Sequence, residues 1–202
     1  MTLYLARHGQ TEWNRDGRMQ GRLGGPLTET GRAQAVDLAA AARALGVRRL
    51  LTSPLPRAVE TARVVAAALG VDPVMRDELV ETDFGECSGL TEAQIADRFP
   101  GLRAERERDK WSHRWPGGES YADMAERVRP LVEGGELRGA DGTMVVAHQS
   151  LNRVLARALG PASRADVLAM AQPSTALLRF SAPGEIAHAD TTELRWRPGL
   201  WR

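Results

Sequence analysis

The chain has 202 residues, of which 43% are hydrophobic and 26% are charged, and its formal net charge is +1. These values are typical of one globular domain, which we expect to span residues 1–202, and a net charge so close to zero favours no nucleic-acid partner. The single cysteine, Cys87, excludes an intramolecular disulfide and metal sites built on several thiolates, and no apolar stretch approaches the length of a membrane span.

Strands and helices are predicted to alternate along most of the chain. Apolar periodicity and helix start and stop signals predict, in chain order, strand Leu3–Ala6, helix Leu27–Leu45, strand Val47–Thr52, helix Ser53–Leu69, helix Thr91–Phe99, helix Tyr121–Leu131, strand Thr143–Ala147, helix Gln149–Leu159, strand Thr175–Phe180 and strand Glu193–Trp196. Because the first strand starts almost at Met1, no room is left for a secretory leader, and we expect a cytoplasmic protein.

This order of elements predicts the fold class. The run Thr143–Ala147 reads as a strand that is covered on both faces, which is typical of the centre of a parallel sheet. Strands that alternate with helices place those helices against the sheet. We therefore expect an α/β fold, a three-layer sandwich with a mostly parallel central sheet and helices on both faces.

Three of the predicted strands end in residues suited to bind an anion. Arg7 and His8 follow the first strand, Arg57 lies near the first turn of the helix after the second, and His148 follows Thr143–Ala147. In a parallel sheet these ends share one edge, where ligands bind in open α/β folds. Guanidinium groups and helix N-termini bind phosphate oxygens, and a neutral imidazole can attack phosphorus. The sequence therefore predicts a phosphoryl-binding site at this edge.

Several strings in the chain resemble the histidine phosphatase superfamily, the phosphoglycerate mutase-like proteins. The matching strings occur in the family's order and are LARHGQTEWN at 5–14, GPLTETGRAQA at 25–35, TSPLPRAVETA at 52–62, ETDFGECSGLT at 81–91, PGGES at 116–120 and VVAHQ at 145–149. The resemblance implies this family's fold and a reaction that needs neither a metal ion nor another cofactor.

The same resemblance implies roles for individual residues. His8 corresponds to the nucleophile that becomes phosphohistidine, while Arg7, Arg57 and His148 correspond to the rest of the phosphate pocket. Asn14 would be a further contact. Glu81 corresponds to the proton donor for the leaving oxygen, and an alkoxide needs such a donor. Asp83 and Glu86 lie close enough in sequence to take that role instead.

A narrower resemblance concerns the substrate. The strings RDKWSHRWPGGESYADMAERVRP at 108–130 and AHQSLNRVL at 147–155 are similar to the bisphosphatase domain of fructose-2,6-bisphosphatases, whose corresponding residues hold a second phosphate. The matching positions are Arg106, Lys110, Tyr121, Gln149 and Arg153, and Lys110 is the only lysine in the chain. Glu92 stands where that family has an aromatic residue. The alternative for residues 103–110 is a solvated helix face with charge pairs.

We expect a phosphatase for a small sugar phosphate or phospho-acid, with a bisphosphate among the candidates. One alternative is a cofactor-dependent phosphoglycerate mutase, and the other is a non-catalytic member of the family. Mutases of the family tend to carry extra segments around the site, so this compact chain favours hydrolysis. The partner is a small phosphorylated metabolite, with no nucleic acid and no membrane, and a homodimer is one open assembly state.

Overall fold

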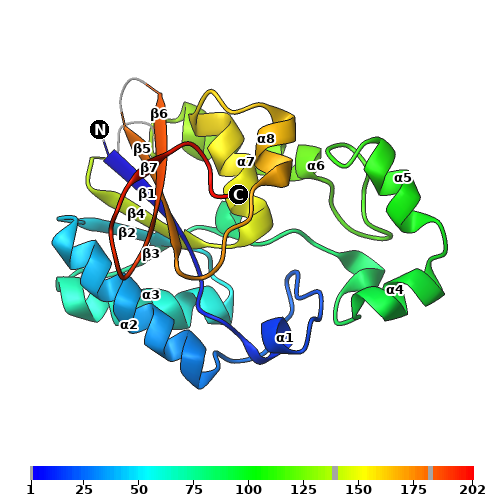
Figure 1. The fold of residues 1–202 in the computed structure, drawn as a ribbon, viewed down its shortest axis with the longest axis horizontal. Helices are drawn as coiled ribbons and strands as arrows, with labels where there is room; N and C mark the ends of the chain where they lie inside the picture. The colour runs from blue at the N-terminus through cyan, green and yellow to red at the C-terminus, as the bar shows by residue number, and fades with distance from the viewer. Residues whose placement is uncertain (1, 138–140, 182–183) are drawn as a thin grey trace.

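A mixed β-sheet forms the centre of the molecule (Figure 1). In the computed structural model, which describes residues 2–137, 141–181 and 184–202, seven strands pair in the order β3-β2-β4-β1-β5-β6-β7. Their bounds are β1 Thr2–Arg7, β2 Arg49–Thr52, β3 Val74–Met75, β4 Thr143–Ala147, β5 Ala176–Ser181, β6 Glu185–Asp190 and β7 Arg197–Pro198. The strands β1 to β4 pair in parallel, whereas β5 pairs antiparallel with β1, β6 antiparallel with β5 and β7 antiparallel with β6.

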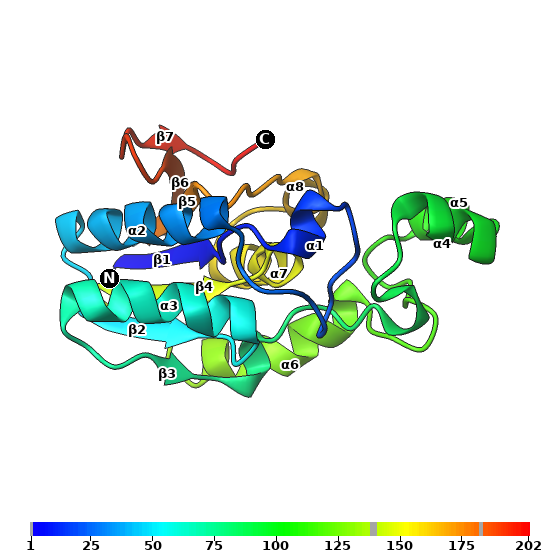
Figure 2. The ribbon, with the colours of Figure 1, turned by 90° about the horizontal axis from the view of Figure 1, so that it is seen from below.

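Helices cover both faces of the sheet, as predicted for a three-layer α/β fold (Figure 2). The bounds of the helices are α1 Glu12–Arg15, α2 Glu29–Ala44, α3 Pro56–Leu69, α4 Glu92–Arg98, α5 Leu102–Arg108, α6 Tyr121–Glu133, α7 Gln149–Leu159 and α8 Arg164–Ala169. Side chains of α2 and α3 pack with one set of strand residues, including Tyr4 and Met144. Those of α6, α7 and α8 pack with the opposite set, including Leu5 and Val145. Alternate strand residues point to opposite faces, so the sheet has an apolar core on each side.

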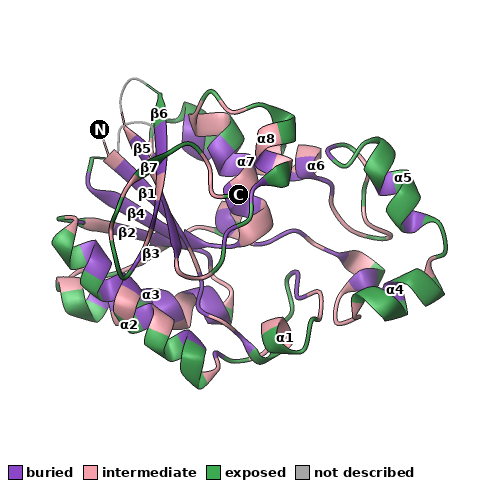
Figure 3. Cartoon of the chain, viewed as in Figure 1, coloured by how far each residue is buried: buried purple, intermediate pink, exposed green. Residues whose placement is uncertain are grey.

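The distribution of burial separates this body from an outlying segment. The strands and the inward sides of their helices are buried, whereas most of α4 and α5 is exposed and lies away from the sheet (Figures 1 and 3). A small apolar cluster of its own holds this segment together, with Phe84, Cys87, Ile95 and Leu102 buried in it. No helix in the part of the chain that the structure describes is both long and apolar enough to cross a bilayer.

Two predicted elements were wrong in place. Glu193–Trp196 is not a strand, because the chain turns there: the backbone N–H of Leu194 donates to the carbonyl of Asp190, and Leu194 has a φ of 52°. The strands at this end are instead β6 and β7. The sequence of β6 has few β-branched or aromatic residues, so its pairing with β5, rather than its own propensity, makes it a strand.

The helix predicted from Ser53 begins later, at Pro56. Proline fits the first turn of a helix because that position needs no N–H donor. The Ser53 hydroxyl therefore lies outside the helix, where it accepts a hydrogen bond from the Leu55 N–H and contacts His148. The short strand β3 was missed from sequence.

Candidate active site

A cavity of about 550 Å³ opens at the carboxyl ends of β1 and β2, beside the start of α7. Ten of the eleven residues predicted for the site line it, namely Arg7, His8, Asn14, Arg57, Glu81, Arg106, Lys110, Tyr121, Gln149 and Arg153. The eleventh residue, His148, lies next to His8, with a distance of 5.2 Å between the two ring centroids. The tertiary structure thus brings together all the residues that were predicted from distant strings.

His8 is buried and is oriented by two hydrogen bonds. Its Nδ1 lies 2.7 Å from the Gly9 carbonyl oxygen, so Nδ1–H is the donor, and its Nε2 accepts a hydrogen bond of 3.1 Å from Arg57 Nε. Burial, together with the charges of Arg7 and Arg57, lowers the pKa of His8 well below its usual value. The ring is therefore neutral at neutral pH, with the lone pair on Nε2.

Arg57 is the most firmly held cation of the site. Its side chain is only 2% exposed, and Nη1 and Nη2 donate to the carbonyls of Leu23 and Gly21 at 2.6 and 2.7 Å. Burial lowers the pKa of Arg57 to about 10, Glu81 opposes the shift, and Arg7 adds to it. Arg57 consequently keeps its positive charge at neutral pH while facing His8.

Arg7 and His148 each have a buried nitrogen without a hydrogen-bond partner among the described residues. Arg7 Nη1 donates to the Gln172 carbonyl at 3.0 Å, but Arg7 Nε is buried and unpartnered. In the fully buried His148 ring the unpartnered nitrogen is Nδ1. Burial, followed by the charges of Arg57, His8 and Arg7, lowers the pKa of His148. Because buried polar groups are normally hydrogen-bonded, these two nitrogens are suited to contact a ligand such as a phosphoryl group.

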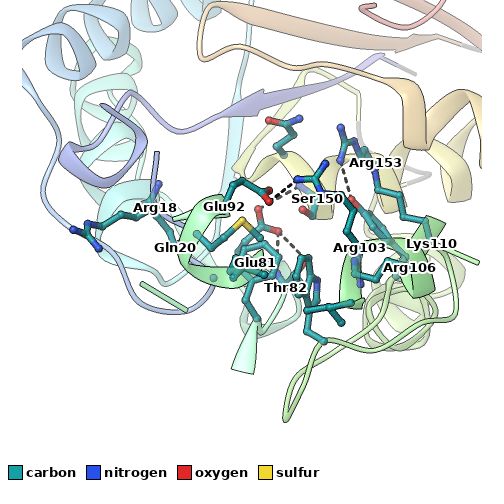
Figure 4. A pocket seen from close by; sticks show the side chains of 18 of the residues that line it. Arg18, Gln20, Glu81, Thr82, Glu92, Arg103, Arg106, Lys110, Ser150 and Arg153 are labelled. Carbon is teal, nitrogen blue, oxygen red and sulfur yellow. Dashed lines mark hydrogen bonds and ion pairs between the residues drawn. The ribbon is translucent and has the colours of Figure 1, made fainter. Parts of the chain in front are cut away.

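Glu81 is placed by the start of α7. Its Oε1 accepts hydrogen bonds from the N–H groups of Thr82 and Leu151, at 2.9 and 3.2 Å, and Oε2 accepts a longer one, 3.3 Å, from the Ser150 N–H (Figure 4). The carboxylate thereby satisfies orphan donors of a helix N-terminus whose own N-cap, His148, makes no side-chain capping bond.

The two alternative carboxylates lie elsewhere. Asp83 Oδ1 accepts a hydrogen bond from the Gly85 N–H, and Glu86 is exposed and forms an ion pair with Arg98. Neither residue lines the cavity, whereas Glu81 does.

A second group of cations lines the other end of the cavity. Arg106 is 8% exposed, and its guanidinium carbon lies 3.8 Å from the ring centroid of Trp115. Arg153 is braced by the Met170 carbonyl and donates to the Tyr121 hydroxyl at 2.8 Å. Burial and the charges of Arg153, Arg106 and Arg103 lower the pKa of Lys110. Cations that repel one another in this way are stabilised by a shared anion.

Sequence reasoning missed several contributors. Arg103 and Arg18 line the cavity, and Arg103 forms a 2.6 Å ion pair with Glu92 at its mouth (Figure 4). Gln172 supports both Arg7 and Asn152 from a loop with no recognisable motif. Ser53 could have been found, because it lies inside the matching string at 52–62. Asn14 lines the cavity as predicted, and its side-chain oxygen accepts a hydrogen bond from the Thr11 N–H.

No group of three or more His, Cys, Asp or Glu side chains in the described part of the chain could hold a metal ion. Guanidinium groups, the Lys110 ammonium and the N-terminus of α7 contribute positive charge to the cavity.

Comparison with known proteins places this geometry in a family. A model of the histidine phosphatase superfamily (branch 1) matches residues 3–191. The glucosyl-3-phosphoglycerate phosphatase of Mycobacterium tuberculosis is 38% identical over 216 aligned positions, covering 98% of this chain and 93% of that protein. The 6-phosphofructo-2-kinase/fructose-2,6-bisphosphatase of Gallus gallus is 37% identical over 76% of this chain, but the match spans only 31% of that longer protein.

Solved structures agree with the sequence matches. The mycobacterial glucosyl-3-phosphoglycerate phosphatase in complex with VO3 superposes with a TM-score of 0.80 at 32% identity, covering 99% of this chain and 98% of that one. The α-ribazole phosphatase of Shigella flexneri gives a TM-score of 0.78 at 25% identity, over 90% and 92%. These relatives are phosphatases, and the chain belongs to the histidine phosphatase superfamily, branch 1.

Proposed function

We propose that the chain hydrolyses phosphomonoesters in two steps through a phosphohistidine on His8. One observation carries this proposal: a buried neutral imidazole presents its Nε2 lone pair beside Arg57, with two buried nitrogens lacking partners close by. A nucleophile for phosphoryl transfer needs a free lone pair, and the phosphoryl group needs fixed positive charge around its oxygens. The site supplies both once the Arg57 Nε–H turns from His8 Nε2 to a phosphoryl oxygen.

In the first step His8 Nε2 attacks phosphorus, and the bond from phosphorus to the ester oxygen breaks. The Arg57 Nε–H, which donates to Nε2, has to turn to a phosphoryl oxygen so that the lone pair reaches phosphorus. Arg7 and His148 donate to the other oxygens. Glu81 gives its proton to the leaving alkoxide from Oε2, the oxygen that accepts only the longest of its backbone hydrogen bonds.

In the second step water attacks the phosphohistidine. Glu81, now a carboxylate, accepts the proton of that water, and the bond between phosphorus and Nε2 breaks. The products are inorganic phosphate and neutral His8, so the cycle closes without a metal ion or an external cofactor.

The substrate proposal rests on the second group of cations. Arg106, Lys110 and Arg153 lie together on one side of the same cavity (Figure 4), and we propose that they bind a second anionic group, with Tyr121 and Gln149 as neutral contacts and Asn14 near the phosphoryl end. A phosphoglycerate carries a carboxylate and a bisphosphate a second phosphate, so the names of two relatives describe substrates with two anionic groups.

The mechanism is tested by trapping the intermediate. Brief reaction with a phosphomonoester labelled on phosphorus should leave acid-labile label on His8, and the His8→Ala variant should carry none. Label on another residue, or no label with full activity, would refute the proposal. A product assay with 3-phosphoglycerate separates hydrolysis, which releases phosphate, from a mutase reaction, which releases an isomer.

The substrate is tested with a panel of phosphorylated metabolites that includes glucosyl-3-phosphoglycerate and sugar bisphosphates. Arg106→Ala and Lys110→Ala should raise KM for doubly anionic substrates and leave p-nitrophenyl phosphate turnover close to that of the unaltered enzyme. An unchanged KM for every doubly anionic compound would remove the second anion site.

The acid role of Glu81 is tested by leaving-group dependence. Glu81→Gln should lose most activity on alkyl phosphates and less on p-nitrophenyl phosphate, whose leaving group hardly needs a proton. Equal losses on both substrates would make Glu81 mainly a cap of α7.

A single domain over residues 1–202, a cytoplasmic location and a homodimeric state stay predictions.

A further inference from the structure

The hydrogen bonding of His148 involves a residue to which neither the comparisons nor the mechanism above assigns a role. The Ser53 hydroxyl lies 2.8 Å from His148 Nε2, and both side chains are fully buried. The other ring nitrogen, Nδ1, is buried and without a hydrogen-bond partner among the described residues. One side of the ring is thus held by the protein, and the other is left for a ligand.

The direction of the hydrogen bond from Ser53 follows from a third group. The backbone N–H of Leu55 donates to Ser53 Oγ at 3.2 Å. The Leu55 N–H occupies one of the two lone pairs of Ser53 Oγ, and among the described residues His148 Nε2 is the one acceptor available to the hydroxyl hydrogen. An imidazole kept neutral by burial carries one N–H, which then has to be on Nδ1.

The backbone fixes the position of Ser53 relative to His148. The Ser53 N–H and the Thr52 hydroxyl both donate to the Val146 carbonyl, at 3.1 and 3.2 Å, where β2 ends beside β4. His148 is the second residue after Val146. Two neighbouring parallel strands therefore set the distance between the hydroxyl and the ring, independently of any ligand.

We propose that Ser53 is a positioning residue that holds His148 in the tautomer with its proton on Nδ1, ready to donate to a bound phosphoryl oxygen. The proposal rests on the proposed function, in which that oxygen lies between His8, Arg57 and Arg7. In the other tautomer Nδ1 would present a lone pair to an anion, which repels it. Negative charge on the equatorial oxygens must be stabilised as the phosphoryl group transfers, so the correct tautomer should act mainly on turnover.

The direct test is the protonation pattern of the ring. Nitrogen-15 NMR of histidine-labelled protein, with the His148 signals assigned from the His148→Gln spectrum, should show a protonated Nδ1 and an unprotonated Nε2. In Ser53→Ala the tautomer with the proton on Nε2 should become populated. A proton on Nε2 in the unaltered protein overturns the proposal, and this measurement does not depend on enzymatic activity.

The kinetic test uses a matched pair of variants. Ser53→Ala should lower kcat about tenfold, the effect of one lost hydrogen bond to a group that stabilises charge, while KM changes by less than about twofold. Ser163→Ala removes a serine hydroxyl that caps α8 and does not line the cavity, and it controls for a general loss of stability. Unchanged kcat and an unchanged tautomer in Ser53→Ala would overturn the inference. If His8 carries no label in the trapping experiment, the proposed function is refuted. The tautomer of His148 can still be measured in that case, so the two failures are distinguishable.

Discussion

The two ends of the cavity are built differently. At the phosphoryl end Arg57 is 2% exposed and Glu81 is 7% exposed, and each makes three or more hydrogen bonds, most of them with the backbone. At the outer end the side chains of Arg103 and Glu92 are 72% and 62% exposed and bind chiefly each other. The side chains at the sheet edge are therefore held by the backbone, whereas α4 and α5 also carry an exposed ion pair that is free to rearrange around a ligand.

The largest expected effect comes from the rigid end. His8→Ala should lower phosphate release at least about a thousandfold, because the nucleophile and its covalent step are lost. The thermal unfolding midpoint should change little, since His8 lies after β1 and not in an apolar core. Residual turnover near that of the unaltered enzyme would assign the nucleophile elsewhere.

A charge-conserving change at the same end should also be severe. Arg57→Lys should reduce kcat/KM about a hundredfold, because an ammonium cannot keep the hydrogen bonds to Gly21 and Leu23 and also donate to a phosphoryl oxygen, as the fork geometry of the guanidinium allows. The comparison variant is Arg103→Lys at the exposed end, where we expect less than about a threefold change. Similar losses in both variants would contradict the contrast between the two ends.

The buried histidines also give the stability a pH dependence. The pKa values of His8 and His148 are lower in the folded than in the unfolded chain, so below about pH 6.5 the unfolded chain binds protons that the folded one does not. Their contribution to the free energy of unfolding is complete above that pH and falls with acidification, by at most about 1.4 kcal/mol per pH unit for each ring. Urea unfolding between pH 7.5 and 5 measures this slope, and His148→Gln should reduce it. Equal stability across the range would be inconsistent with two neutral buried rings.

At the outer end the cation–π contact between Arg106 and Trp115 offers a more moderate test. Trp115→Leu keeps an apolar side chain but removes the ring face that lies 3.8 Å from the guanidinium carbon. Without the ring, Arg106 is less well oriented, and the binding of a doubly anionic substrate should weaken by about 1 kcal/mol. KM for that substrate should therefore rise about fivefold. Steady-state kinetics with a singly charged ester is the control, and a rise of KM for both substrates would point to a general distortion of the wall.

The smallest effect is expected from the ion pair at the mouth. Glu92→Gln should release Arg103 for a substrate anion and lower KM for doubly charged substrates about twofold to threefold. Because both side chains are largely exposed, the free energy of unfolding should change by less than about 1 kcal/mol. A raised KM would show that Glu92 contacts the substrate itself.

Local patterns in the sequence determined much of this molecule. The apolar run of β4 and the alternation of strands and helices predicted the α/β layers. The position of Arg7, Arg57 and His148 at strand and helix ends predicted their meeting, because parallel strands end at one edge. These features depend on residues close in sequence, and a single chain displays them directly.

The tertiary structure alone decided the contacts between segments far apart in the chain. The order of strands depends on pairing between distant residues, such as the pairing of β1 with β4. So do the donation from Arg57 to His8, the capping of α7 by Glu81 and the hydrogen bond between Ser53 and His148. Each of these three hydrogen bonds joins residues that lie between 49 and 95 positions apart in the sequence. Such contacts form only when the whole sheet has assembled.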